Sequence, residues 1–143
     1  MKSLVTILTV LFCVCLARAQ DRGCIKLNAD EGTRQGFSAT VVFTEKKPFK
    51  MLRGTAILGA TNEPLENVFV EVFVADSKTK ELQRIAGCRT LADGKFGFND
   101  LAKGTYILRF SKDGGFAITE ISIKVSPNSK RDEEITGFVQ LGT

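Results

Sequence analysis

The pattern that most constrains this chain runs from residue 52 to residue 116. Short runs of alternating apolar and polar side chains are interrupted about every 8–12 residues by Gly, Pro, Asn or Asp, as in all-β sandwiches. An alternation with period two places one set of side chains in a core and the other in solvent. No segment shows the 3.6-residue apolar period of an amphipathic helix. We therefore expect an all-β protein: a seven-stranded Greek-key β-sandwich with one or two extra N-terminal strands.

The expected strands follow from these runs. Two N-terminal strands cover residues 24–28 and 37–44, and the seven of the sandwich cover residues 51–58, 67–75, 81–91, 95–99, 105–112, 117–126 and 134–141. Asp93-Gly94 is the strongest turn signal, because a two-residue hairpin needs positive φ at such positions. We expect residues 81–91 and 95–99 to form a hairpin around it.

The N-terminus has the anatomy of a secretory signal peptide. Lys2 supplies a positive charge, residues 3–16 are a 14-residue apolar run, and Ala17-Arg18-Ala19 is an A-x-A cleavage site. The run is shorter than the ~20 apolar residues that span a bilayer, which disfavours the alternative of an uncleaved anchor. We expect cleavage after Ala19, a secreted or periplasmic protein, and no membrane span in the mature chain.

Cleavage leaves the chain almost neutral. The full sequence has 20 Lys and Arg against 16 Asp and Glu, and removal of Lys2 and Arg18 reduces the net charge from +4 to +2. Nucleic-acid binding needs a clustered basic face, so this small and evenly mixed charge gives no reason to expect it.

Two cysteines, Cys24 and Cys88, remain after cleavage. In an exported chain such a pair is expected to form a disulfide. The alternatives are a redox dithiol, disfavoured by the absence of a C-x-x-C spacing and of any His to lower a thiol pKa, or two ordinary core residues.

Several kinds of catalytic and metal site lack the residues they need. The chain contains no His, so it cannot supply the usual zinc ligands of a peptidase or the base of a Ser-His triad. Paired-carboxylate chemistry is formally open to Glu63, Glu66 and Glu71, but nothing places two of them in a cleft. We expect no enzyme activity, no metal and no cofactor.

The spacing of turn and core residues resembles that of the carboxypeptidase regulatory-like domain, a transthyretin-like, or prealbumin-like, β-sandwich. The motifs are Gly54-x-x-Ile57, Pro64-Leu65-x-x-Val68-x-Val70, Thr90-x-x-Asp93-Gly94-x-Phe96-x-Phe98-x-x-Leu101, Gly104-x-Tyr106-x-Leu108 and Gly115-Phe116. The family often has Asp where this chain has Leu58, and Gly where it has Asn62. Together with the signal peptide at 1–19, we expect N-terminal strands that dock on the sandwich at 20–50, and the resemblance implies a regulatory-like sandwich at 51–143.

One feature favours a contact surface. The strand expected at 67–75 is apolar on both faces, because Phe69 and Phe73 alternate with the core valines; Ile118 and Phe138 are likewise expected on outer faces. These four residues form a contiguous partner site, or are singly exposed, or are covered by the N-terminal strands. We favour the third explanation, with the Cys24–Cys88 bond holding those strands against the sheet.

These observations predict a non-catalytic, secreted or periplasmic interaction or structural module. In metallocarboxypeptidases the similar module sits beside a zinc peptidase domain, which this chain is too short to contain. Its partner is expected to be another envelope or secreted protein. The alternative is a small carbohydrate-binding protein acting on a polysaccharide, since starch-binding modules share the broad fold. That alternative is weakened because the chain has no Trp and its single Tyr106 is expected on an inner face.

Overall fold

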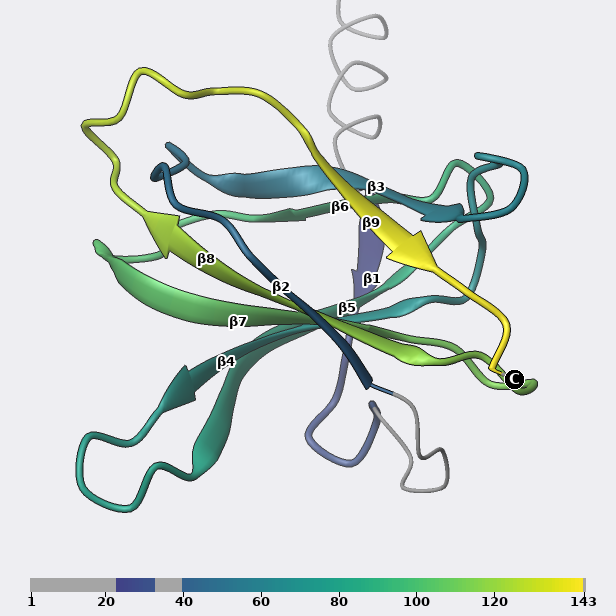
Figure 1. The fold of residues 1–143 in the computed structure, drawn as a ribbon, viewed down its shortest axis with the longest axis horizontal. Coiled ribbons are helices and arrows are strands. Elements are labelled where there is room, and N and C mark those ends of the chain that lie inside the picture. Colours follow the sequence, from purple (N-terminus) through teal and green to yellow (C-terminus); the bar gives the residue numbers. More distant parts are fainter. Residues whose placement is uncertain (1–22, 33–39, 143) are drawn as a thin grey trace, which may run out of the picture.

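The computed structural model describes residues 23–32 and 40–142, and these are all-β, with strands in two sheets and no helix (Figure 1). The predicted signal peptide, residues 1–19, lies outside the described residues. No helix in the described parts of the chain has the length and apolar character needed to cross a membrane. The strands are β1 (Cys24–Lys26), β2 (Thr40–Thr44), β3 (Leu52–Leu58), β4 (Phe69–Ala75), β5 (Leu82–Thr90), β6 (Lys95–Phe98), β7 (Gly104–Ser111), β8 (Ile118–Val125) and β9 (Ile135–Val139).

The larger sheet has the strand order β1-β5-β4-β7-β8-β2, and the smaller has the order β6-β3-β9. Figure 1 shows β3, β6 and β9 forming one layer and the longer strands β4, β5, β7 and β8 forming the other. The N-terminal strands occupy the two edges of the larger sheet. β1 is antiparallel to β5, and β2 is parallel to β8. Residues 37–39, predicted to begin the second strand, lie outside the described residues.

A single hydrophobic core fills the space between the sheets. The period-two alternation predicted for β4, β7 and β8 is present, since the core residues alternate with outer-face residues such as Glu71 and Arg109. Phe110 of β7 packs edge-on against Phe96 of β6, with 5.3 Å between ring centroids, and so links the two layers. The fully buried large side chains are Leu52, Val68, Val70, Val72, Leu108, Phe110, Ile123, Val125 and Val139.

The hairpin predicted at Asp93-Gly94 is wrong, although the turn itself is present. Gly94 has a φ of 67° and donates its N–H to the Leu91 carbonyl. However, β5 before the turn belongs to the six-stranded sheet, and β6 after it belongs to the three-stranded sheet. The reason is that the Gly94 carbonyl accepts a hydrogen bond from Ala56 of β3 at 2.8 Å, which directs the chain into the other layer.

The loop after β3 contains a turn in which Asn62 adopts a left-handed conformation. Asn62, which stands where the family often has Gly, has a φ of 60° and donates its N–H to the Leu58 carbonyl at 2.8 Å. Asn is one of the few residues besides Gly that tolerate this left-handed conformation. Asn62 therefore supports a turn at this position.

Residues 45–50 carry the chain from the edge of the larger sheet to β3 in the smaller one. Phe49 is buried and continues the pairing with β8 through Val125, after Pro48 interrupts the strand. The Arg131 guanidinium lies 3.8 Å from the Phe49 ring centroid and forms an ion pair with Glu45 at 3.2 Å. A cationic group stacked on an aromatic ring and paired with a carboxylate fixes this crossover against the loop before β9.

Candidate functional site

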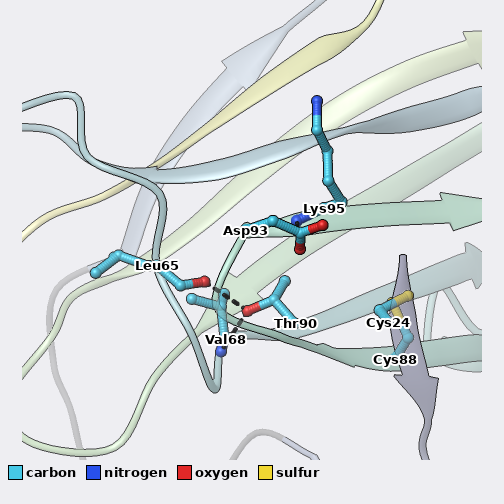
Figure 2. Close-up of a disulfide and its surroundings, with 7 residues drawn as sticks. All are labelled: Cys24, Leu65, Val68, Cys88, Thr90, Asp93 and Lys95. Atoms are coloured by element: carbon cyan, nitrogen blue, oxygen red, sulfur yellow. Dashed lines mark hydrogen bonds between the residues drawn. A yellow bond between two sulfur atoms is a disulfide. The ribbon is translucent and has the colours of Figure 1, made fainter. Parts of the chain in front are cut away.

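Cys24 of β1 and Cys88 of β5 form a disulfide, as predicted, with 5.6 Å between their Cα atoms (Figure 2). The strands are antiparallel, with Cys24 opposite Thr90 and Lys26 opposite Cys88, so the bond joins them diagonally. Cys88 is buried in the core. The bond therefore fixes the first described strand to the middle of the chain.

Thr90, close to this disulfide, holds a loop in place through its buried hydroxyl (Figure 2). Its Oγ1 accepts the Val68 N–H at 3.0 Å and donates to the Leu65 carbonyl at 2.7 Å. The loop that leads into β4 is thereby attached to the end of β5. Both hydrogen-bonding functions of the hydroxyl are used, so it is a structural group.

The structure separates the four residues predicted as a contact patch. Phe69 and Phe73 of β4 and Ile118 of β8 lie on the outer face of the six-stranded sheet, whereas Phe138 belongs to β9 in the other sheet. Phe73 is only 8% exposed, Phe69 and Ile118 are half-buried, and Phe138 is 40% exposed. Because they lie on two sheets and one is buried, these residues do not make up one exposed patch.

Within the described residues, the N-terminal strands β1 and β2 extend the sheet at its edges and do not lie over Phe73. The Arg109 guanidinium lies 4.4 Å from the centroid of the Phe73 ring. Residues 29–32, which follow β1, line a depression of about 330 Å³ together with Phe73 and its charged neighbours. Phe73 is therefore covered by the Arg109 side chain of β7 and bordered by residues 29–32.

Charged side chains on this outer face are paired with one another. Glu71, only 3% exposed, forms an ion pair with Arg84 at 3.0 Å, and Arg109 pairs with Glu120 at 2.6 Å. Arg84 also donates to the backbone carbonyl of Asn28 at 2.6 Å and to that of Glu31. Buried charges are tolerated when they are paired in this way. The depression is thus built from charges that already hold the 28–32 segment on the sheet.

Three acidic residues before β9 each have a cationic partner. No group of three or more possible metal ligands occurs within residues 23–32 and 40–142. The hydrogen bond to Glu133 raises the pKa of Arg131 above its usual value. The ion pairs are Asp132 with Arg53 at 3.3 Å, Glu134 with Lys95 at 3.2 Å, and Glu133 with Arg131.

The carboxylates considered for paired chemistry also have separate surroundings. Glu71 is buried on β4 beside Arg84, whereas Glu63 accepts a hydrogen bond from the Thr61 hydroxyl at 3.3 Å in the loop after β3. Glu66 lies exposed in the loop before β4.

The one tyrosine lies on an inner face, as predicted. Tyr106 is buried, and its hydroxyl donates to the Ala102 carbonyl at 2.6 Å. Among the described aromatic residues, Phe43 and Phe138 are the large hydrophobic ones exposed to solvent. A small pocket of about 250 Å³ opens at the end of the core beside Phe98 and Leu101, with Lys50 and Asp100 also in its lining.

Strand β2 presents an edge that is uncharged and that no other described strand covers. It pairs with β8 on one side, and no described strand pairs with its other side. Val42 is 64% exposed and Phe43 is 47% exposed, so large apolar side chains point to solvent from both faces of this strand. Between Thr40 and Thr44 the strand contains no charged residue and no Pro, the residues that usually protect an edge.

The remaining sheet edges are short or partly occupied. β1 has three residues and is held by the disulfide. At β6 the backbone of Gly23 lies close to Lys95, since a Cβ on Gly23 would come within 3.2 Å of the Lys95 Cβ. On β9 the Phe138 carbonyl accepts the Thr119 hydroxyl at 2.7 Å.

The alternating pattern of residues 37–44 did not predict that β2 would be an open edge. The signal was present in Val42, an apolar residue among the polar side chains of an otherwise alternating strand.

A scan against protein-family models found no match for this chain, and a search of curated proteins found none either.

Proposed function

We propose that this protein is a non-catalytic, secreted or periplasmic interaction module of the carboxypeptidase regulatory-like type, and that it binds an extended segment of a partner chain at the open edge of β2. The proposal takes the core to be a seven-stranded Greek-key β-sandwich, to which β1 and β2 are additions. Support for export comes from the predicted signal peptide and from the Cys24–Cys88 disulfide, which is typical of oxidising compartments.

The observation that carries the proposal is the exposure of Val42 and Phe43 on an edge strand without protecting charges. An open strand offers a row of backbone donors and acceptors, and an added strand satisfies them while its side chains cover alternate apolar neighbours. Natural sheets protect edges that are not used, so an uncharged and apolar edge favours a binding role.

A capture experiment with matched variants tests the proposal. The exported protein is crosslinked to secreted and envelope proteins, and the captured chain is identified by mass spectrometry. Val42→Pro removes a backbone donor at the open edge, while Ile85→Ser removes an apolar side chain that is 44% exposed on β5, outside this edge.

We expect one protein chain to be captured by the wild type and by Ile85→Ser, and to be lost with Val42→Pro. Circular dichroism must show that Val42→Pro is still folded. Capture that is unchanged in Val42→Pro contradicts the β2 assignment. Retention on an insoluble polysaccharide, with no captured protein, replaces the proposal with the carbohydrate-binding alternative.

A further inference from the structure

We infer that the chain bound at the β2 edge is a second copy of this protein, paired antiparallel through a two-fold axis at Val42. The inference rests on the proposed function, since it names the partner of the same edge. In the resulting dimer the two six-stranded sheets join into one continuous sheet through their β2 strands.

The direction of the backbone groups fits this pairing. The Glu45 N–H donates to the Ser122 carbonyl of β8 at 2.9 Å, and the parallel register places Phe43 opposite Ile121. Because backbone groups of successive residues in a strand point to opposite sides, those of Val41 and Phe43 face β8 like those of Glu45. The N–H and C=O groups of Thr40, Val42 and Thr44 consequently face the open edge.

An antiparallel partner centred on Val42 uses these groups in register. Val42 then lies opposite its own copy, and Thr40 lies opposite Thr44 of the other chain. Each of these residues has its backbone groups on the open edge, so every such pair is a hydrogen-bonded pair of the antiparallel ladder. In a register displaced by one residue, Val42 would lie opposite Phe43, whose backbone N–H and C=O groups face β8 and cannot bond to the second copy.

The side chains of Thr40–Thr44 are also self-complementary in this register. Val42 packs on its copy, and each Val41 lies opposite Phe43 of the other chain at a site where side chains approach closely. Pairs of aromatic and β-branched residues, and pairs of threonines, stabilise antiparallel strands. A two-fold contact uses the same residues on both subunits. The segment Thr40–Thr44 meets this requirement because its side chains pair with those of a second copy.

The charges near the edge are compatible with a second copy. The strand itself is neutral, and the charged run Glu45-Lys46-Lys47 follows it at one end only. The two-fold axis places the two copies of Lys46 at opposite ends of the paired strands, about 27 Å apart for eight residues of strand. This separation exceeds the ~8 Å Debye length at physiological salt, so the like charges do not oppose pairing.

The expected dimer is weak. Pairing of five-residue strands gives a contact at the small end of specific interfaces, well below about 1,200 Å² of buried surface. We expect a readily reversible dimer, so chemical crosslinking is a better first measurement than chromatography.

The crosslinking experiment uses the exported full chain with a single introduced cysteine. The reagent is a bismaleimide whose two reactive groups are less than about 10 Å apart. In the proposed register the two Cα atoms of Val42 are about 5.5 Å apart, while those of Thr40 are about 14 Å apart. Val42→Cys should therefore crosslink to a dimer at least ~10-fold faster than Thr40→Cys. The double variant Thr40→Cys/Thr44→Cys should crosslink as fast as Val42→Cys, because position 40 of one chain then lies opposite position 44 of the other.

Sedimentation at increasing concentration gives the second readout, with Val42→Pro as the variant and Val42→Thr as its control. The wild type and Val42→Thr should dimerise, and Val42→Pro should remain monomeric while keeping its circular dichroism spectrum. Equal crosslinking of Val42→Cys and Thr40→Cys overturns the inference, as does a wild type that stays monomeric. If the wild type is monomeric but captures a different protein in a Val42→Pro-sensitive manner, the proposed function stands and only the second copy is refuted.

Discussion

Reduction of the Cys24–Cys88 disulfide should remove a large share of the stability of this protein. The bond closes a segment with a sequence separation of 64 residues. In the chain-entropy model a crosslink of this length restricts the unfolded chain by about 4 kcal/mol at 25 °C. Since small domains are stable by only about 5–15 kcal/mol, the reduced protein should be marginally folded.

The structure also indicates where the reduced protein opens first. β1 has three ladder positions on β5, and the next backbone contact is the Leu27 N–H to the Gly87 carbonyl at 3.0 Å. Without the crosslink this short edge strand is held by few interactions. We therefore expect faster amide exchange at Leu27 in the reduced protein, together with weaker attachment of the 28–32 segment to Arg84.

Urea unfolding of the oxidised and the reduced wild type measures the effect, because both forms keep the same atoms at residues 24 and 88. With an m-value of about 1–2 kcal/mol/M, a loss of about 4 kcal/mol lowers the midpoint by about 2–4 M. The variant Cys24→Ala/Cys88→Ala is the control for effects of the reductant and should behave like the reduced protein. A change in unfolding free energy below about 1 kcal/mol would refute the chain-entropy reasoning.

Three further predictions follow from close packing, buried hydrogen bonding and pH. Gly54→Ala should destabilise by about 3 kcal/mol or prevent folding, because its Cβ would lie 1.8 Å from the Ile135 carbonyl, whereas Gly97→Ala, with its nearest contact at 3.8 Å, should change the melting temperature little. Thr90→Val should cost about 2–4 kcal/mol in urea unfolding, since it leaves the buried Val68 N–H and the part-buried Leu65 carbonyl without their partner, and a cost below 1 kcal/mol contradicts this role. Backbone N–H groups of Thr79 and Lys78 lower the pKa of Asp76, so its contribution to stability is present above the pKa of the unfolded chain and is lost as the pH falls through the folded pKa; an NMR titration midpoint at or above the usual Asp value contradicts this.

The faces of the central strands could be predicted from the sequence alone. Alternation along β4, β7 and β8 identified inner residues such as Val70, Leu108 and Ile123, because strand side chains point to opposite faces in turn. The pairing of Cys24 with Cys88 was also predictable, because only these two cysteines remain if the predicted signal peptide is removed, and two cysteines permit one intramolecular bond. These inferences need only local geometry or counting.

The accessibility of the predicted patch could not be obtained in this way. Phe73 points outward as predicted, but the burial of its ring depends on Arg109 from another strand. Phe138 points outward from a different sheet, which the alternation of a single strand does not reveal. The solvent exposure of an outward side chain depends on residues distant in sequence.

The sequence by itself determined the class of structure, the inner faces of the long strands and the disulfide, because these depend on period-two patterning and residue identity. Only the tertiary structure decided which strands share a sheet. The Asp93-Gly94 turn connects two sheets because Gly94 bonds to β3, a contact that no local signal contains. It also decided that β2 is an open edge, because an edge is defined by the absence of a neighbouring strand in the described structure and not by the residues of the strand.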